Sequence, residues 1–347
     1  MNHEAGKIMI IQEKNHMGRR LAFSLLGLLC LMSWCAVLPA AAFETQLKKV
    51  SLIPHWSPQA QFAGYYVAME KGIYRKHGMD MTVLKGGPGC SSLDYLENGR
   101  ADFAVQWLTT AMQRHDRGLP LVHLAQVVPR SSMLLVAKKS SGIRKPSDMN
   151  GKKVGLWGGD FAIPPRAFFV KHNLTVKEVP QSYTVNLFLR GGVDVASAMW
   201  YNEYHTILGT GVDNDELTVF PLHTHGVNFP EDGLYMMEAA YKKNPGLAQA
   251  FVKASFEGWQ YAFDHPEEAL DIITAHMRKA RIPSNRAHQR WMLSRMKDLV
   301  MPGKSGIPAD TLNPENFKSV ADFLLKERLI RQAPDYRTFT GGTHGNR

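Results

Sequence analysis

The 347-residue chain contains little cysteine: only Cys30, Cys35 and Cys90. The first two lie inside an N-terminal apolar segment, so a chain that has lost this segment retains Cys90 alone. A single thiol cannot form an internal disulfide, and the cysteines do not have the spacing of zinc ligands. The mature fold must therefore be stabilised by its hydrophobic core, to which a hydrophobic content of 44% can contribute.

Long runs of one charge are also missing, although the formal net charge is +10. The longest purely basic runs are pairs such as Lys48-Lys49 and Lys152-Lys153. Scattered charges of this kind are typical of a solvated basic surface, so we expect no nucleic-acid partner. The sequence also lacks a nucleophile elbow, a paired-carboxylate arrangement and a dinucleotide fingerprint. We therefore expect a protein that is not an enzyme and that uses no cofactor.

One long apolar run is present, and it lies near the N-terminus. Arg19 and Arg20 precede an apolar run over residues 21–37, and a proline and three alanines follow before Phe43. This order is that of a secretory signal peptide with a small-residue cleavage site, although a retained membrane anchor is the alternative. We expect residues 1–42 to be removed on export to the periplasm.

After this segment, short apolar segments alternate with amphipathic helical segments. Strands are predicted at residues 50–54, 81–84, 101–107, 121–127, 133–138, 154–157, 194–199 and 217–221. From Pro245 onward the pattern is mainly helical. Alternation of this length is typical of mostly parallel sheets covered by helices, so the predicted fold class is α/β.

The series of strands and helices restarts partway along the chain, which predicts two lobes. We expect the chain to cross between the lobes near residues 136–142 and 229–237. The predicted division is residues 43–138 and 235–330 for lobe 1, residues 139–234 for lobe 2, and residues 331–347 for a frayed tail. One large doubly wound sheet with a helical cap is the alternative, but a single core rarely grows to this size.

Several segments carry a family resemblance. The first, residues 55–83 (HWSPQAQFAGYYVAMEKGIYRKHGMDMTV), contains a Trp, a polar-aromatic loop and a helix ending in K-G-x-Y-x-x-x-G-x-D. The others are ENGRADFAVQW, RGLPLVHLAQV, SGIRKPSDMNGKKVGL, GGVDVASAMWYNEY and PGLAQAFVKASFEGWQYAFDHPEEAL. In order and spacing these segments resemble the NMT1/THI5-like substrate-binding proteins over residues 50–270.

The resemblance implies a two-lobed periplasmic binding protein, type II-like, which closes over its ligand like a Venus flytrap. It also implies a small-molecule ligand, such as a thiamine-precursor pyrimidine or riboflavin, and an ABC transporter permease in the inner membrane as partner. A eukaryotic branch is enzymatic and uses pyridoxal phosphate, a lysine and a histidine of its own chain. Here Gln106 and Thr110 stand at those two positions, so that chemistry lacks its reactive groups.

Ligands of α/β lobes bind at the carboxyl ends of strands, and this rule selects the candidate site residues. The aromatic and polar candidates of the first half are Trp56, Tyr65, Gln106, Trp107 and Ser131. Trp56 is expected to stack on a flat ligand, whereas Tyr65 and Trp107 could equally pack in the core. Gln106 could pair with a ring nitrogen and its neighbouring amine, and Ser131 lies where the chain enters a crossing.

In the second half, Gly158, Gly159 and Asp160 follow one predicted strand, and Asn202 and Glu203 follow another. The glycine loop could bind an anion or a carbonyl oxygen through its backbone, or it could be a plain turn. Glu203 could accept hydrogen bonds from an aminopyrimidine edge. The alternative is that Asn202 caps a helix and Glu203 lies in its first turn.

The remaining patterns suggest fewer functions. His223 and His225 are spaced like a metal pair, but no third ligand accompanies them, and we expect no metal site. Extra cations in the cleft, for which Arg130 and Arg166 are the candidates, would instead favour an alkyl sulfonate or taurine-like ligand. A sensory module of the same fold is a further alternative. We expect the protein to be a monomer.

Overall fold

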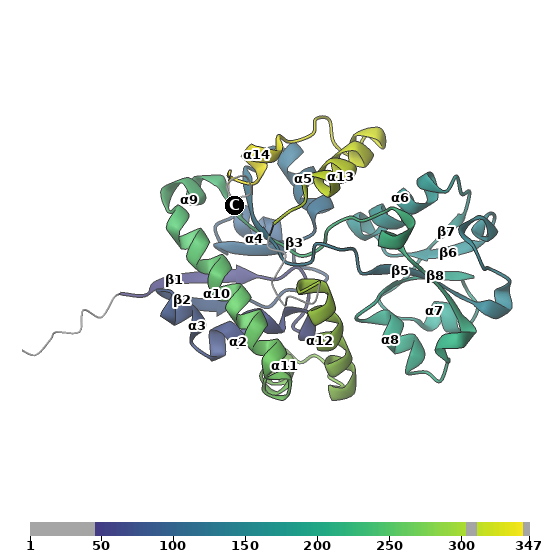
Figure 1. Ribbon diagram of the computed structural model, residues 1–347, viewed down its shortest axis with the longest axis horizontal. Helices are drawn as coiled ribbons and strands as arrows, with labels where there is room; N and C mark the ends of the chain where they lie inside the picture. Colours follow the sequence, from purple (N-terminus) through teal and green to yellow (C-terminus); the bar gives the residue numbers. More distant parts are fainter. Residues whose placement is uncertain (1–45, 303–310, 343–347) are drawn as a thin grey trace, which may run out of the picture. The chain divides into compact units, whose positions relative to one another are not determined.

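The computed structural model describes residues 46–302 and 311–342 of the chain (Figure 1). The predicted signal peptide, residues 1–42, lies outside these residues. Among the helices of the described part, none is both long enough and apolar enough to span a bilayer. The described chain folds as an α/β protein with two five-stranded sheets, one in each lobe.

The sheet of lobe 1 has the order β2-β1-β3-β10-β4. Its strands are β1 (Lys48–Ile53), β2 (Met79–Val83), β3 (Phe103–Gln106), β4 (Leu121–Gln126) and β10 (Gly233–Met237). Strand β1 runs parallel to β2 and β3, whereas β10 runs antiparallel to β3 and β4. The predicted parallel pairing is therefore found among the first three strands, and β10 makes the sheet a mixed one.

The sheet of lobe 2 has the order β7-β6-β8-β5-β9. Its strands are β5 (Met133–Lys138), β6 (Lys153–Leu156), β7 (Lys177–Pro180), β8 (Val195–Met199) and β9 (Leu217–Pro221). Strand β6 runs parallel to β7 and β8, and β5 runs antiparallel to β8 and β9. The arrangement repeats that of lobe 1, because in each sheet the antiparallel strand is the first strand after a crossing.

This arrangement corrects one predicted boundary. The segment Met133–Lys138 was assigned to lobe 1, but it is β5 and it pairs with β8 and β9 of the lobe 2 sheet. The first crossing therefore lies between β4 and β5, before the predicted position near residues 136–142. An apolar strand pattern shows that a segment enters a sheet, but it does not show which sheet, and this explains the error.

The helices of lobe 1 pack closely around its sheet. They are α2 (Ala63–Glu70), α3 (Ile73–Lys76), α4 (Ser92–Glu97), α5 (Leu108–Asp116), α9 (Glu238–Lys243), α10 (Pro245–Asp264), α11 (Pro266–Lys279), α12 (Arg286–Val300), α13 (Pro314–Lys326) and α14 (Tyr336–Phe339). Helices α2 and α10 contact each other through two glycines. A Cβ atom at Gly64 would lie 2.3 Å from Trp259, and one at Gly258 would lie 2.3 Å from the Gly64 carbonyl oxygen. Larger residues would force these two helices apart.

Lobe 2 has shorter helices, and three of them flank the candidate site. They are α6 (Ile163–Lys171), α7 (Asn186–Leu189) and α8 (Glu203–Leu208), with the 3-10 turn η4 (Gly159–Ala162) before α6. In lobe 1 a similar 3-10 turn, η1 (Ala60–Phe62), precedes α2. Both turns follow the carboxyl end of a strand, and they bring loop residues of the two lobes to the same region.

The end of the described chain also differs from the prediction of a frayed tail. Residues 331–342 include α14, and the side chain of Phe339 is fully buried. Its ring lies 6.3 Å from that of Tyr235 on β10 and 5.5 Å from that of Phe317 on α13, measured between centroids. Hydrogen bonds from Arg331 to Asp116 and from Tyr336 to the Leu312 carbonyl oxygen also attach this segment to lobe 1.

Candidate functional site

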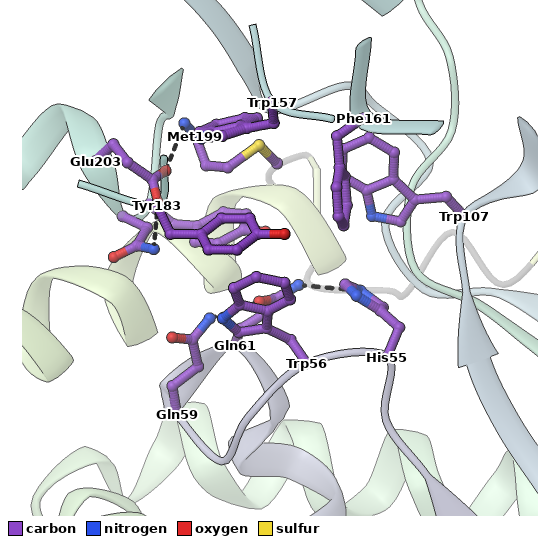
Figure 2. A pocket seen from close by; sticks show the side chains of 12 residues that line it. His55, Trp56, Gln59, Gln61, Trp107, Trp157, Phe161, Tyr183, Met199 and Glu203 are labelled. Carbon is purple, nitrogen blue, oxygen red and sulfur yellow. Dashed lines mark hydrogen bonds between the residues drawn. The ribbon is translucent and has the colours of Figure 1, made fainter. Parts of the chain in front are cut away.

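A cavity lies where the strand ends of the two lobes meet (Figure 2). Lobe 1 lines it with His55, Trp56, Gln59, Gln61 and Trp107, and lobe 2 lines it with Trp157, Phe161, Tyr183, Met199, Tyr201, Asn202 and Glu203. The cavity has a volume of about 40 Å³. The cavity is therefore a narrow slot.

Strand ends explain why these side chains converge. Trp56, Trp107 and Trp157 follow β1, β3 and β6 within a few residues, and Met199 is the last residue of β8. Parallel strands of one sheet end at the same edge, so each lobe contributes its residues from one edge. In consequence both edges present aromatic side chains to the slot.

Aromatic rings from the two lobes touch at the slot. The ring centroid of Trp56 lies 4.7 Å from that of Tyr183 and 6.0 Å from that of Phe161, and both pairs are edge-to-face. Trp107 makes a further edge-to-face contact with Phe161 at 4.8 Å. Tyr183 is 51% exposed, and Figure 2 shows its ring next to that of Trp56. These contacts line the slot with apolar ring surfaces.

A buried carboxylate forms the polar part of the lobe 2 wall. Glu203 is only 7% exposed. Its Oε2 accepts a hydrogen bond from the Met199 backbone N–H at 3.0 Å, and its Oε1 accepts one from the Asn202 side-chain amide at 2.8 Å. Burial raises the pKa of Glu203 to about 7, because desolvation disfavours the charged form more than the backbone hydrogen bonds favour it.

The lobe 1 wall carries a hydrogen-bonded group that extends to the second crossing. His55 donates from Nε2 to Oδ1 of Asp232 at 2.8 Å, and Gln61 donates to the other oxygen at 2.9 Å. Gln59 in turn donates to the side-chain oxygen of Gln61 at 2.7 Å. Because Nε2 of His55 carries the hydrogen, its Nδ1 is available as an acceptor when the ring is neutral.

Three buried nitrogen atoms of the cavity lining have no hydrogen-bond partner among the described residues. They are Nδ1 of His55 and the indole Nε1 atoms of Trp107 and Trp157. Buried polar atoms are normally paired, so unpaired ones in a cavity indicate positions for ligand atoms or water. The two indoles can only donate, whereas the neutral imidazole nitrogen accepts.

Four of the ten predicted site residues line this cavity: Trp56, Trp107, Asn202 and Glu203. Asn202 occupies the N-cap position of α8, but its side chain makes no capping hydrogen bond. It bonds instead to Glu203 and to His288. The capping alternative is therefore wrong for the Asn202 side chain, while Glu203 does lie in the first turn of α8.

The other predicted residues of lobe 1 and the first crossing lie outside the lining. Tyr65 is 1% exposed and packs against Trp259, because it faces α10 rather than the strand ends. Gln106 is turned into lobe 1, where its Oε1 accepts from the Trp107 backbone N–H at 2.8 Å. Ser131 donates to Glu231 of the other crossing at 3.1 Å.

The glycine loop supports the slot without lining it. Gly158, Gly159 and Asp160 are absent from the lining, while the next residue, Phe161, belongs to it. Gly159 has a φ of +63°, a value that glycine adopts without strain. Asp160 accepts a hydrogen bond from Gln113 of α5 at 3.1 Å, which is a contact between the lobes. The loop therefore places Phe161 against Trp56 and Trp107.

Sequence reasoning missed most of the remaining lining residues. Trp157 follows a strand just as Trp56 and Trp107 do, so the same rule could have found it. Tyr183 lies in a loop and Phe161 in the 3-10 turn η4, and their sequence context gives no comparable signal. His55 precedes Trp56 directly, and its role depends on Asp232, which is 177 positions away.

A second cavity lies beside the first crossing, and it contains one of the two arginines considered above. Arg130, Ser131, Ser132, Leu134, Trp200, Tyr204, Val219, Pro221 and His223 line it. Arg166 instead pairs with Glu178 at an exposed position. Neither Arg130 nor Arg166 therefore lines the slot. Among the described residues no group of three potential metal ligands forms around His223 and His225.

Comparisons with known proteins agree with this architecture. The riboflavin-binding protein RibY of Chloroflexus aurantiacus is 26% identical over 70% of this chain and 71% of its own length. A formylaminopyrimidine-binding protein of Halalkalibacterium halodurans is 21% identical over 70% of this chain and 75% of its own. A pyrimidine phosphate synthase of Saccharomyces cerevisiae, THI5, is 24% identical over 43% of this chain and 42% of its own.

A solved structure shows the same fold. The periplasmic aliphatic sulphonate binding protein SsuA from Escherichia coli superposes with a TM-score of 0.65 at 14% identity, covering 84% of this chain and 96% of that one. The family model described as NMT1/THI5 like matches residues 59–269. Because this match covers more than half of the 347 residues, the chain belongs to the NMT1/THI5-like family.

Proposed function

We propose that this protein is the periplasmic solute-binding component of an ABC importer, and that its ligand is a small planar nitrogen heterocycle such as a thiamine-precursor pyrimidine. The observation that carries the proposal is the narrow aromatic slot, which contains a buried carboxylate and three unpaired nitrogen atoms. The names of two relatives, which bind riboflavin and a formylaminopyrimidine, support this ligand class.

The shape of the slot favours a flat ligand. Trp56 contributes one wall, and Tyr183 and Phe161 contribute rings from the other lobe. A heterocycle inserted between them would replace the ring contacts across the slot with contacts to its own faces. Aromatic pairs contribute about 0.5–1.5 kcal/mol beyond area burial, so two faces would supply a sizeable part of a micromolar affinity.

The polar groups favour a ligand with both donors and acceptors on its edge. Glu203 can accept from an exocyclic amine, and hydrogen bonds to a charged acceptor are about twice as strong as neutral ones. The indole N–H groups of Trp107 and Trp157 can donate to ring nitrogens or a carbonyl oxygen. An aminopyrimidine offers this combination, because its amine lies beside a ring nitrogen.

The same lining disfavours the alternative ligands. It contains no lysine or arginine, and a buried carboxylate would repel the anionic group of a sulfonate or taurine. Riboflavin is larger than a single ring, so the walls of this narrow slot would have to move further apart for it than for a pyrimidine. A pyridoxal phosphate enzyme would need a lysine for the Schiff base, and the slot offers none.

Two measurements on the mature protein test the proposal. Native mass spectrometry of freshly purified protein should show a co-purifying molecule of the mass of a small heterocycle. Calorimetry should show an aminopyrimidine binding at about micromolar dissociation constant, near −8 kcal/mol, and taurine not binding. A protein that binds taurine but no aminopyrimidine or flavin would refute the proposed ligand class.

The transport role needs its own test. The protein with bound aminopyrimidine should stimulate ATP hydrolysis by the permease and ATPase of its transporter, reconstituted in liposomes. A matched control uses the Trp56→Ala variant, which should lose the stimulation because it loses the ligand. Stimulation that is independent of any ligand would contradict the transport proposal.

A further inference from the structure

Helix α12 holds both walls of the slot through two neighbouring faces. Residues three apart lie on the same face of a helix. Gln289 accepts a hydrogen bond from the Ala60 backbone N–H at 2.7 Å, and Met292 accepts one from the Gln61 backbone N–H at 3.2 Å through its sulfur. This face therefore binds η1, which carries the glutamines of the lobe 1 wall.

The adjacent face of α12 binds lobe 2. His288 bonds through Nε2 to the side-chain oxygen of Asn202 at 2.9 Å, and Trp291 donates from its indole to the Trp200 carbonyl oxygen at 3.1 Å. The ring of Trp291 stacks on His205 of α8 with centroids 4.7 Å apart. Two consecutive residues of α12 thus contact the two walls of the slot: His288 contacts the lobe 2 wall, which carries Glu203, and Gln289 contacts the lobe 1 wall.

The hydrogen bonds between α12 and Glu203 form a chain with a definite direction. The amide nitrogen of Asn202 donates to Glu203, so the amide oxygen faces His288 and accepts from its Nε2–H. The Nδ1 of His288 is then an acceptor, and the Nδ1 of His205, 2.9 Å away, must donate to it. Each group in this chain fixes the orientation of the next one.

The orientation of the Asn202 amide decides how Glu203 is presented. An asparagine amide fits its site almost equally well in two orientations, and only its hydrogen-bond partners distinguish them. Reversed, the amide would place its oxygen against the Glu203 carboxylate, and an ionised Glu203 would lose a donor and gain a repulsive neighbour. In the tautomer that carries its hydrogen on Nε2, His288 disfavours this reversal, because that hydrogen requires an oxygen in front of it.

We propose that His288 is a positioning residue for ligand selection: through Asn202 it holds the Glu203 carboxylate as an acceptor, and it thereby selects ligands that carry an exocyclic amine. This inference rests on the proposed function, because it requires a heterocycle in the slot. It assigns to α12 a role in selection that reaches beyond joining the two lobes.

Two substitutions of His288, by Gln and by Asn, differ in side-chain length by one methylene group. Together they separate a role in ligand selection from a role in joining the two lobes. His288→Gln keeps an amide N–H at about the reach of Nε2 and should preserve the contact with Asn202. His288→Asn is too short to reach Asn202. Both variants remove the imidazole that His205 contacts, so a difference between them reports on Asn202 alone. Thermal unfolding verifies that each variant is folded.

The readout is the ratio of dissociation constants for a 4-aminopyrimidine and the matching pyrimidin-4-one, measured by calorimetry. His288→Asn should reduce the preference for the amine by about tenfold, the size expected when a hydrogen bond to a charged group is weakened. His288→Gln should retain most of that preference. In a Glu203→Gln background, His288→Asn should leave the ratio unchanged, because the carboxylate through which His288 acts is missing.

Each outcome decides the question. If His288→Asn weakens both ligands equally, or if its effect on the ratio persists in the Glu203→Gln background, His288 only joins the lobes and the inference is wrong. If His288→Asn does not fold, His288→Ala replaces it: a reduced ratio in His288→Ala with a retained ratio in His288→Gln supports the inference, and a native ratio in His288→Ala overturns it. If the native protein binds neither ligand, the proposed function itself fails.

Discussion

Replacing Glu203 with glutamine tests the central claim that a carboxylate recognises the ligand. The side chain is 7% exposed and already accepts two hydrogen bonds, from Met199 and Asn202. Glutamine preserves the volume but removes the charge and turns one acceptor into a donor. A hydrogen bond to a charged group is worth about 1.5–3 kcal/mol, so we expect an aminopyrimidine to bind about 10- to 150-fold more weakly.

The direction in which the ligand affinity changes with pH tests whether Glu203 binds as a carboxylate. The pKa of Glu203 is about 7 in the ligand-free protein, because burial disfavours the carboxylate. A ligand that donates to the carboxylate lowers this pKa, so binding releases a proton when the pH is below about 7. The affinity should therefore be constant above that pH and fall as the pH decreases, at up to about tenfold per pH unit.

Calorimetry between pH 5.5 and pH 8.5, in buffers of different ionisation enthalpy, measures both the affinity and the released proton. The titration of the ligand itself is measured separately and subtracted. Glu203→Gln should remove the remaining slope, whereas Glu327→Gln, a change of the exposed acid that follows α13, should leave it unchanged. A native affinity that does not vary with pH, or a slope that survives in Glu203→Gln, would show that the carboxylate is not the acceptor.

Four further substitutions test which residues contribute to ligand binding and which contribute to folding. Trp56→Ala should weaken heterocycle binding at least tenfold in calorimetry, because one wall is lost, and unchanged affinity would argue against stacking. Tyr65→Phe should leave the affinity unchanged, because this hydroxyl lies in the core. Arg130→Met should also leave it unchanged, and a loss of binding would move the ligand to the second cavity. Gly64→Ala should lower the free energy of unfolding by about 1–3 kcal/mol in denaturant titrations, because its Cβ would overlap Trp259.

Strand ends account for three of the four predicted residues that line the cavity. Trp56, Trp107 and Glu203 each follow an apolar segment of strand length, and a strand end fixes where the next residues lie; their role in ligand binding stays a prediction. Tyr65 is predicted at the start of the helix that follows the first strand, and it does lie in the first turn of α2. Successive residues of a helix differ in direction by about 100°, so the direction of the Tyr65 side chain depends on which face of α2 packs against α10. That packing is a tertiary contact, which the sequence pattern does not show.

The parts that could not be predicted depend on contacts between distant segments. Strand β5 has the apolar pattern of any buried strand, and only its pairing with β8 and β9 places it in lobe 2. Tyr183 reaches the slot from a loop whose path has no sequence period. The contact of His288 with Asn202 joins residues 86 positions apart. The apolar periodicity of residues 286–300 predicts a helix, but it does not show which residues the polar face of that helix contacts.

The second crossing shows how one short segment connects the cavity to the hinge. Glu231 accepts from the backbone and the hydroxyl of Ser132 on the first crossing, and burial raises its pKa to about 8. The next residue, Asp232, accepts instead from His55 and Gln61 of the cavity wall. Successive side chains of an extended chain point in opposite directions, so the Glu231 carboxylate can face the first crossing while the Asp232 carboxylate faces the cavity wall. Nδ1 of His55 is therefore separated from Glu231 by one imidazole ring, one carboxylate and one peptide unit. The fold thus joins the polar wall of the slot to both crossings through two consecutive residues.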